Sequence, residues 1–562
     1  MLAKKTVWRA VADALAAENV DYVFGLPGNP KHLIYDLTEH TEVKFVLVRD
    51  EKSAVSCAYA YARLMRRPGI VFSNPGPGIA NLVTGLLEAT AGSLPVIAIA
   101  NGVVQSHDGM GAFQELDAVA LMRPVTKWAV KVTDPSRLPW VMRRAFAIAM
   151  NGRPGAVFIE IPSDMADQPV AMPPYGAGYT RHRSRPAAEA VAAAAEAIAA
   201  ARQPVLLCGS GAVFAQAAAA VAGLADRVGM AVMTTPGGRG IYPEDGPLAL
   251  GLTGLYFTEA GKTYFDSADL VVSVGSRLEA FSTNSWSFWP KDARFIQIDI
   301  DPETMGMNIR PDIALAGDAE LALKDVLAVL PPIPKTERDA RFAAIENLRE
   351  AYRPKLESAA SDDSVPIRVP RVLDAVNRIF GHDTILMKEN GGADLWSYYW
   401  PHYRVLDIDD CVPMAEQTAM SMGIIGAIGA KLARPGKKIV CFAGDGAMQM
   451  SLAELATAAE LKCGITWIVL NNHAFGWVQY NQVLNQKPFL ATGFEVNSDF
   501  PEIARAQSCF GIKVTRPDQI DDALTQALKA NIEGIPALVD VAIQPHHYHE
   551  HFERVHRARI DH

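Results

Sequence analysis

Short apolar bursts alternate with segments of helical spacing along the first 165 residues. The bursts read VDYVFGLPG, VKFVLV, GIVFSN, PVIAIAN and AVFIEIP. This alternation predicts a parallel β-sheet with helices on both faces. The pattern stops at QPVAMPPYGAGYTRHRSRP, whose Pro, Gly and Arg content is typical of an interdomain linker. We therefore predict a first α/β domain over residues 1–168.

The same alternation returns twice more. A second block has an Ala-rich helical stretch, strands PVLLCGSG, MAVMTT, LVVSVGSR and FIQIDI, and a proline-rich end, VLAVLPPIPK. A third block has strands TILMKEN, RVLDID, KIVCFAGDG, GITWIVLNN and PALVDVAI. We predict a central domain over 186–335 and a C-terminal domain over 366–545, so the expected fold class is α/β with three doubly wound parallel-sheet domains.

Composition excludes several classes of protein. The chain has 562 residues and a formal net charge of −9, which argues against nucleic acid or an anionic membrane surface as the main partner. No apolar run reaches about 18 residues, the length a membrane-spanning helix needs. Arg9 and Asp13 interrupt the stretch where an export signal would be apolar. Six scattered cysteines form no CxxC pair. We expect a soluble, cytoplasmic protein without a disulfide framework.

The last segment, residues 546–562, holds six of the thirteen histidines. A metal site is one interpretation, because imidazole is a good ligand for zinc, copper and nickel. The interpretation we favour is a solvated, partly helical tail or a flap over a neighbouring pocket.

The most specific motif lies in the third block. One strand ends in Gly444, Asp445 and Gly446, a helical segment follows, and the next strand ends at Asn472 after a gap of 24 residues between GDG and NN. Ligands of doubly wound sheets bind at the carboxyl ends of strands, so Asp445 and Asn472 are expected to face one point. A carboxylate, an amide oxygen and a backbone carbonyl suit Mg²⁺, and the amides of Gly446 and Ala447 could approach a diphosphate. The alternative is an ordinary turn with a capping Asp and a polar Asn-Asn pair.

With this spacing the chain resembles thiamine-diphosphate-dependent enzymes, in the branch of acetohydroxyacid synthase, benzaldehyde lyase and oxalyl-CoA decarboxylase. The resemblance covers nearly the whole chain and implies that the three blocks are a pyrimidine-binding, a central nucleotide-binding-like and a diphosphate-binding domain. It implies that Asp445, the Asn472 side chain and the Ala474 carbonyl hold the metal. The KENGGADLW stretch matches the diphosphate support, which would comprise Gly391, Gly392 and Ala393.

The resemblance also assigns residues around the thiamine ring. The family uses a glutamate against N1′ of the aminopyrimidine, and Glu51 in VLVRDEKSAV matches it, although this chain has Asp50 where many relatives have His. Met420 matches the bulky apolar residue that bends the cofactor, and the Thr418 carbonyl would accept from the 4′-amino group. The alternatives are an acid favoured by a helix N-terminus for Glu51 and a core-filling side chain for Met420. Because the two halves of such sites come from different subunits, the resemblance implies a homodimer at least, with a homotetramer expected.

The reaction is indicated by GMGAFQELDAVALMRPVTKW, which resembles the AFQE and RPITK run of acetohydroxyacid synthases. Gln114 matches a glutamine that contacts substrate oxygen, and Phe113 its aromatic neighbour; a Gln satisfied by backbone groups is the alternative. Asn29 and Pro30 occupy the pocket loop where decarboxylases usually place histidines. Carboligation, or the reverse cleavage, of 2-oxo acids or 2-hydroxy carbonyl compounds is therefore favoured, with small molecules as substrates.

Several departures keep alternatives open. Asn481 stands where the synthases have Trp, and FST with WPKDA resembles sulfoacetaldehyde acetyltransferases. A 2-hydroxyacyl-CoA lyase or oxalyl-CoA decarboxylase, and a flavin-dependent 2-oxo acid oxidase, are further alternatives. The central block has candidate nucleotide-binding residues, and it could hold FAD, ADP or no nucleotide. These residues are Gly209, Gly211, Arg277, Asp299 and Asp301.

Overall fold

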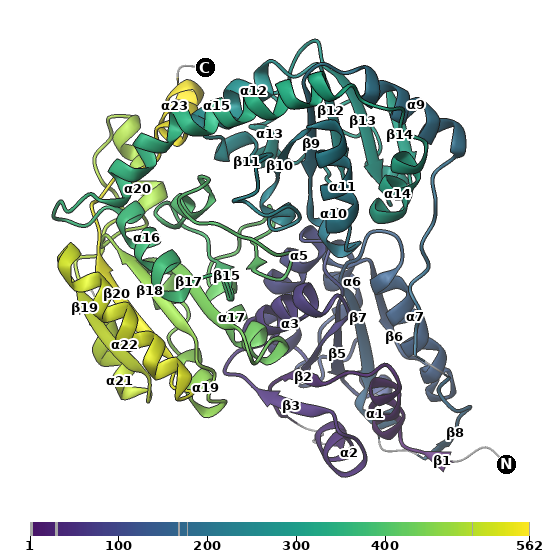
Figure 1. The fold of residues 1–562 in the computed structure, drawn as a ribbon. Coiled ribbons are helices and arrows are strands. Elements are labelled where there is room, and N and C mark those ends of the chain that lie inside the picture. The colour runs from purple at the N-terminus through teal and green to yellow at the C-terminus, as the bar shows by residue number, and fades with distance from the viewer. Residues whose placement is uncertain (1–3, 29–31, 167–168, 177, 497, 561–562) are drawn as a thin grey trace. The chain divides into compact units, whose positions relative to one another are not determined.

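The computed structural model describes residues 4–28, 32–166, 169–176, 178–496 and 498–560. The chain divides into two compact units, one made of Met1–His182 with Gln417–Pro435 and the other of Arg183–Glu416 with Gly436–His562. The described residues form three six-stranded sheets, and every strand pair within them is parallel. The predicted fold class, three doubly wound parallel sheets, is confirmed (Figure 1).

The first unit contains the sheet with strand order β3-β2-β4-β5-β7-β6. Its strands are β2 (Tyr22–Gly25), β3 (Lys44–Leu47), β4 (Gly69–Ser73), β5 (Val96–Gly102), β6 (Trp128–Lys131) and β7 (Val157–Pro162). Its helices are α1 (Val7–Ala17), α2 (His32–His40), α3 (Glu51–Met65), α4 (Pro77–Asn81), α5 (Val83–Ala91), α6 (Ala118–Met122), α7 (Leu138–Met150) and α8 (Ser163–Ala166). A two-stranded antiparallel pair joins β1 (Lys4–Lys5) to β8 (Val170–Ala171).

Side chains on the central strands alternate between two helical layers. Ile70, Phe72 and Ile97 point into the core formed with α1 and α7. The intervening Val71 and Ala98 are buried outside that core. A strand buried on both faces reads as a continuous apolar run, which is why these strands could be predicted from the sequence.

Helix α17 (Met422–Ala433) also belongs to the first unit and packs on α3. The Ser56 hydroxyl donates to Met422 Sδ at 2.9 Å, and Arg434 donates to the Leu64 carbonyl at 2.7 Å. A Cβ on Gly429 would lie 2.1 Å from the Cys57 carbonyl oxygen, so the two backbones touch only because residue 429 is glycine. These contacts progress in the same order along both helices, so α3 and α17 run in the same direction.

The second unit contains two sheets. The central sheet has the order β11-β10-β9-β12-β13-β14, with strands β9 (Pro204–Cys208), β10 (Ala231–Thr234), β11 (Ala249–Leu252), β12 (Leu270–Val274), β13 (Arg294–Asp299) and β14 (Ile313–Ala316). Its helices are α9 (Ala188–Ala200), α10 (Ser210–Phe214), α11 (Ala218–Val228), α12 (Glu259–Asp266), α13 (Ala280–Thr283), α14 (Ala319–Val329) and α15 (Lys335–Ala360).

The C-terminal sheet has the order β16-β15-β17-β18-β20-β19. Its strands are β15 (Thr384–Lys388), β16 (Cys411–Val412), β17 (Lys438–Gly444), β18 (Thr466–Asn471), β19 (Phe510–Val514) and β20 (Ala537–Ala542). Its helices are α16 (Val369–Phe380), α18 (Asp445–Gln449), α19 (Glu454–Glu460), α20 (Gly476–Leu484), α21 (Phe500–Ala506), α22 (Ile520–Ile532) and α23 (Glu550–Ile560).

The predicted strand RVLDID is wrong. Residues 404–409 are irregular and the edge strand β16 follows them. The Asp410 amide donates to the Asp407 carbonyl at 3.0 Å and the Asp409 amide to Asp407 Oδ1 at 2.9 Å. An Asp that accepts from the backbone two residues on stabilises a turn, and this turn replaces the strand.

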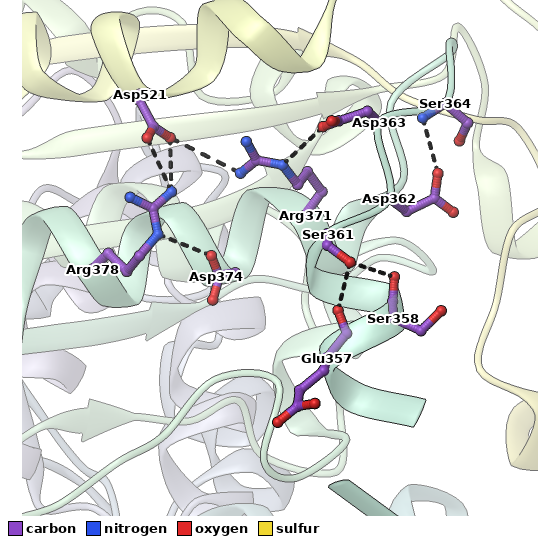
Figure 2. Close-up of polar contacts among 10 residues, drawn as sticks. All are labelled: Glu357, Ser358, Ser361, Asp362, Asp363, Ser364, Arg371, Asp374, Arg378 and Asp521. Atoms are coloured by element: carbon purple, nitrogen blue, oxygen red, sulfur yellow. Dashed lines mark hydrogen bonds and ion pairs between the residues drawn. The ribbon is translucent and has the colours of Figure 1, made fainter. Parts of the chain in front are cut away.

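The connection between α15 and α16 is held by side-chain contacts (Figure 2). Ser361 donates to the Glu357 carbonyl at 2.8 Å as α15 ends, and Asp362 accepts from the Ser364 amide at 2.9 Å. Arg378 on α16 then bridges to Asp521 of α22 at 2.9 and 3.0 Å. The connection between the central and C-terminal sheets is therefore an ordered turn.

Arg239 connects the central domain to the loop after β15. Its side chain is fully buried and donates to both carboxylate oxygens of Glu244, at 2.7 and 2.6 Å. It also donates to the carbonyls of Ser397 and Tyr403, at 2.8 and 2.9 Å. The two bonds to carbonyls fix the segment 397–403, which follows the predicted diphosphate support in the sequence.

Among the described residues, no helix has the length and apolar character required to cross a membrane.

Candidate active site

Glu51 begins helix α3 of the first unit. Asp50 adopts an extended backbone and its carboxylate accepts from the Lys52 amide at 2.7 Å, which caps the helix and fixes where it starts. Glu51 is 9% exposed, and its Oε2 accepts a hydrogen bond from Asn81 Nδ2 at 3.0 Å. The predicted glutamate is thus a nearly buried acid with one defined amide partner.

A glycine turn separates Glu51 from Gln114. A Cβ on Gly78 would lie 2.9 Å from Glu51 Oε1 and 2.9 Å from Ser73 Oγ. Gly76, at φ +61°, faces the other way, where a Cβ would lie 2.9 Å from the Gln114 carbonyl oxygen. The structure therefore brings two of the predicted residues, Glu51 and Gln114, to opposite sides of one turn that follows β4.

The loop carrying Phe113 and Gln114 is closed on itself. Glu115 accepts hydrogen bonds from the amides of Gly109 and of Ala112, and these bonds lower the pKa of Glu115. Gln114 is half-buried and adopts φ +61°, an uncommon conformation for a residue with a side chain. Phe113 is 88% exposed. An aromatic ring held out by an ordered loop is a candidate contact for a ligand or a partner.

A pocket of about 640 Å³ lies under the base of this loop. Lys131 enters it and pairs with Asp108 at 2.6 Å and with Glu160 at 3.6 Å. Glu160 is 4% exposed, and its burial raises its pKa. These charged groups anchor the loop that presents Phe113.

Thr418 and Met420 lie in the first unit, just before α17. Thr418 has φ +48°, and the Ala419 amide donates to the buried Glu88 carboxylate at 3.2 Å. Because α3 and α17 run in the same direction, Met420 lies at the same end of the helix pair as Glu51. Met420 is only half-buried, so it is not a fully enclosed core side chain.

Asp445 lies at the carboxyl end of β17 in the second unit and is 1% exposed. The amide of Gly446 donates to its Oδ1 at 3.0 Å, and the amide of Ala474 to its Oδ2 at 3.2 Å. Burial raises the pKa of Asp445 to about 7, although the backbone hydrogen bonds oppose this shift. Among the described residues, Asp445 accepts hydrogen bonds from backbone amides, and a bound cation would neutralise its buried charge.

The two asparagines after β18 have different roles. Asn471 is 3% exposed and bonds within the sheet, donating to Asp540 at 2.9 Å and accepting from the His473 amide at 3.2 Å. Asn472 is half-buried, and its Nδ2 lies 2.6 Å from where a Cβ on Gly476 would stand. Asn472 follows the end of β18, in the same segment as Ala474, whose amide donates to Asp445; its role as a metal ligand stays a prediction. Its neighbour Ala474 is 4% exposed.

Several glycines lie near Asp445. A Cβ on Gly444 would meet no atom of the described residues within 4 Å, and one on Gly391 would lie 3.9 Å from the Gly444 amide. Gly446 is covered by the ring of Phe475, and Ala447 is buried at the start of α18. The predicted single helix after GDG is wrong, because α18 ends at Gln449 and α19 begins at Glu454.

The predicted diphosphate support continues into a buried ion pair. Ala393 caps the 3₁₀ turn Asp394–Tyr398. Lys388 and Asp394 are both fully buried and pair at 2.8 Å, and burial raises the pKa of Asp394 to about 6. The Oδ1 atom of Asp394 has no hydrogen-bond partner among the described residues and lies 3.2 Å from where a Cβ on Gly391 would stand. The sequence argument did not identify this pair.

In the central sheet the glycine turn is explained by packing. A Cβ on Gly209 would lie 2.4 Å from the Gly275 carbonyl, and the Gly211 amide donates to that carbonyl at 2.9 Å. Arg277 pairs with Glu279, and Asp299 accepts from the Asp301 amide at 2.9 Å. The contacts of these five residues are accounted for by the fold.

The histidine-rich segment is docked on the second unit. His549 stacks on Tyr399 with ring centroids 3.9 Å apart, and its Nε2 lies 3.2 Å from the Tyr352 hydroxyl. His551 Nε2 lies 3.1 Å from the Gly254 carbonyl oxygen. Burial lowers the pKa of His551 to about 4 and that of His549 well below its usual value. These imidazoles are neutral packing groups near pH 7.

Profiles of one protein family match all three predicted blocks. The N-terminal TPP binding domain of thiamine pyrophosphate enzymes matches residues 5–121, the central domain matches 191–326, and the C-terminal TPP binding domain matches 393–541. The chain belongs to the thiamine pyrophosphate enzyme family.

The relatives of this thiamine pyrophosphate enzyme include a probable acetolactate synthase large subunit of Methanocaldococcus jannaschii, 31% identical, with 95% of this chain and 91% of the relative aligned. The acetolactate synthase large subunit of Haemophilus influenzae is 30% identical, with 95% and 93% aligned. Acetolactate synthase large subunit IlvB1 of Mycobacterium tuberculosis is 31% identical, with 95% and 87% aligned.

These findings confirm the family and class of enzyme predicted from the sequence, a thiamine-diphosphate-dependent carboligase or lyase. They do not favour the CoA lyase, sulfoacetaldehyde acetyltransferase or flavin oxidase alternatives. The predicted domain boundaries and individual site residues stay predictions. The pocket-loop residues Asn29 and Pro30 lie outside the described residues.

Sequence reasoning missed Asn81 and the glycines at 76 and 78, which contact Glu51 and Gln114. The PGPG sequence directly after an apolar strand was the signal that could have identified the glycines, because such turns at strand ends form ligand sites. It also missed Glu416, which accepts from the Phe281 amide at 2.7 Å and whose pKa is raised by burial to about 7.

Proposed function

We propose that this enzyme is an acetolactate-synthase-like carboligase that uses thiamine diphosphate and Mg²⁺ to join a small 2-oxo acid to a second carbonyl compound. The observation that carries the proposal is the buried Asp445 carboxylate at the end of β17, which accepts hydrogen bonds from the backbone amides of Gly446 and Ala474 and has no ion-pair partner among the described residues. A divalent cation in this position would offset the cost of burying the charge, and carboxylate and amide oxygens are suitable ligands for Mg²⁺.

The diphosphate end of the cofactor fits the residues present. Asp445, Asn472 and the Ala474 carbonyl would hold the metal. Glycine backbone at Gly391, Gly392, Gly444 and Gly446, with Ala393 and Ala447, would border the diphosphate. The assignment is supported by the space at Gly444, where a Cβ would have no atom of the described residues within 4 Å.

Residues of the first unit would bind the thiamine ring. When bound, thiamine diphosphate would supply an acidic C–H group whose carbon, once its proton has been removed, can add to the carbonyl of the 2-oxo acid. The Glu51 carboxyl would share a proton with N1′ of the aminopyrimidine, and the Asn81 amide would keep the carboxyl oriented. The Thr418 carbonyl would accept from the 4′-amino group, Met420 would support the bent cofactor, and Gln114 with Phe113 would contact the substrate.

Glu51 and Asp445 belong to different compact units. Because the sites of thiamine-diphosphate-dependent enzymes take their two halves from different subunits, we infer that two copies of the chain complete each site, so that the enzyme is at least a homodimer and, as expected from the resemblance, a homotetramer. The 88% exposure of Phe113 supports a partner or ligand on that face. We further propose a cytoplasmic enzyme.

The test is to supply the full-length protein with thiamine diphosphate, Mg²⁺ and pyruvate, alone and with a second 2-oxo acid, and to identify products by mass spectrometry. The expected product is a 2-hydroxy-3-oxo acid formed with release of one CO₂. Cofactor binding without any carbon–carbon coupling, or release of the free aldehyde alone, would contradict the proposal. A Glu51→Gln preparation is the control for background chemistry.

A further inference from the structure

The segment that follows β20 returns to the neighbourhood of the candidate metal site. After β20, the Ile543 amide donates to the Asn471 carbonyl at 3.0 Å, so the segment leaves the sheet next to the strand that presents Asn472. Tyr548 follows and is 7% exposed. Its ring packs against Tyr480 and Phe552, with centroids 4.4 and 5.0 Å apart. The tail therefore brings a tyrosine to the carboxyl end of β18.

The Tyr548 hydroxyl lies between two glycines of the candidate site. It stands 2.9 Å from where a Cβ on Gly392 would be and 3.1 Å from the equivalent position on Gly476. Neither glycine has a backbone conformation in the left-handed region, so both are explained by the space that the tyrosine occupies. The Gly476 position also faces Asn472 Nδ2 at 2.6 Å, which places the hydroxyl next to that side chain.

Within the described part of the chain this hydroxyl forms no hydrogen bond, and it is not among the oxygen atoms sealed from solvent, so its proton is available to a bound ligand. A phenol is a donor to oxyanions, and the groups around it belong to the proposed diphosphate support and metal site. The Tyr548 hydroxyl therefore has a proton to donate at the place where the proposed function puts the diphosphate oxygens.

The tail is held firmly enough to position this hydroxyl. Trp477 of α20 donates from Nε1 to His556 at 3.2 Å and packs edge-on against Phe552. On the preceding side, Trp396 Nε1 donates to the His547 carbonyl at 3.0 Å, and directly after Tyr548 the ring of His549 is stacked on Tyr399. Both sides of Tyr548 are therefore fixed to elements of the second unit.

We propose that Tyr548 is a cofactor-binding residue whose hydroxyl donates a hydrogen bond to the diphosphate of bound thiamine diphosphate. This inference rests on the proposed function. The histidine-rich segment is then part of the cofactor site, and its docking is coupled to cofactor binding through one hydrogen bond.

Tyr548→Phe removes the hydroxyl and keeps the ring. Its affinity for thiamine diphosphate is measured on the metal-supplied apoprotein by the fluorescence of the nearby tryptophans. Hydrogen bonds to charged groups predict a dissociation constant about tenfold higher than for the natural protein. Thiamine without phosphates should bind the variant and the natural protein equally. Tyr480→Phe, the same change on the neighbouring ring, is the matched control and should leave both affinities unchanged.

The outcomes separate this inference from the function on which it rests. If the natural protein does not bind thiamine diphosphate, the proposed function fails. If it binds and Tyr548→Phe binds equally well, only the role of Tyr548 is overturned. Weaker binding accompanied by faster proteolysis of residues 546–562 in the cofactor-free variant would also overturn it, because the loss would then come from an undocked tail.

Discussion

The two compact units hold their key carboxylates in different ways. In the first unit, Glu51 accepts from an asparagine side chain and borders a glycine turn shared with Gln114. In the second unit, Asp445 is 1% exposed and is bonded by backbone amides, and burial raises its pKa to about 7. The Asn81 side chain can adjust as Glu51 gains or loses a proton. The backbone amides around Asp445 are fixed, as is suitable for a carboxylate that binds a cation.

This contrast predicts which substitution abolishes binding and which abolishes turnover. Asp445→Ala should lose Mg²⁺ and thiamine diphosphate together, weakening both by at least about a hundredfold, because it removes the charged ligand. Isothermal titration with each ligand measures the effect. Asp540→Asn, a change at a nearby acid that bonds to Asn471, is the control. An unchanged affinity in Asp445→Ala would refute the metal assignment.

Glu51→Gln should have the converse effect. Loss of a general acid–base group lowers turnover by roughly 10²–10⁴-fold. The affinity for thiamine diphosphate should change by less than about threefold, because Gln is close in size and still accepts from Asn81. Steady-state kinetics and cofactor titration on the same preparation give both values. Activity at the natural level in Glu51→Gln would remove the proposed role.

The buried acid Glu416 of the second unit should make the free energy of unfolding depend on pH. Burial raises the pKa of Glu416 from 4.5 to about 7, so the folded state binds this proton more tightly than the unfolded state. Such a group favours folding below pH 4.5, and this contribution is lost as pH rises through 7. Glu416→Gln should therefore raise the free energy of unfolding at pH 8 by about 1–2 kcal/mol, with no gain at pH 4.5. Denaturant titrations at the two pH values test this, and equal effects at both would contradict it.

The central strands could be predicted and several edge strands could not. β4, β5, β9 and β12 are buried at every position, so their sequences are unbroken apolar runs. The missed edge strands β6, β14 and β19 are partly exposed, and β16 has only two residues. The edge strand β11 was also missed, although all four of its residues are buried. Their pairing depends on the strand beside them, which a local hydrophobic pattern does not contain.

The candidate site divides in the same way. Asp445 and Asn472 could be placed together because the ends of adjacent parallel strands meet, and one crossover connects them. The contact between Glu51 and Asn81 joins residues 30 positions apart through a turn whose course is set by packing. Tyr548 reaches Gly392 only after the chain has completed the whole C-terminal sheet. Long-range contacts of this kind leave no local pattern in a single sequence.

The smallest expected effect tests the turn that separates Glu51 from Gln114. In Gly78→Ala the new Cβ would meet Glu51 Oε1 and Ser73 Oγ, each 2.9 Å away, so the carboxylate must shift by a few tenths of an ångström. A displacement of that size should lower kcat by about three- to tenfold, with thiamine diphosphate affinity unchanged. Gly436→Ala, where a Cβ would meet no atom of the described residues within 4 Å, is the matched control and should retain full activity. If both variants were equally active, the position of Glu51 would not depend on this turn, and the side-chain contact with Asn81 alone would account for it.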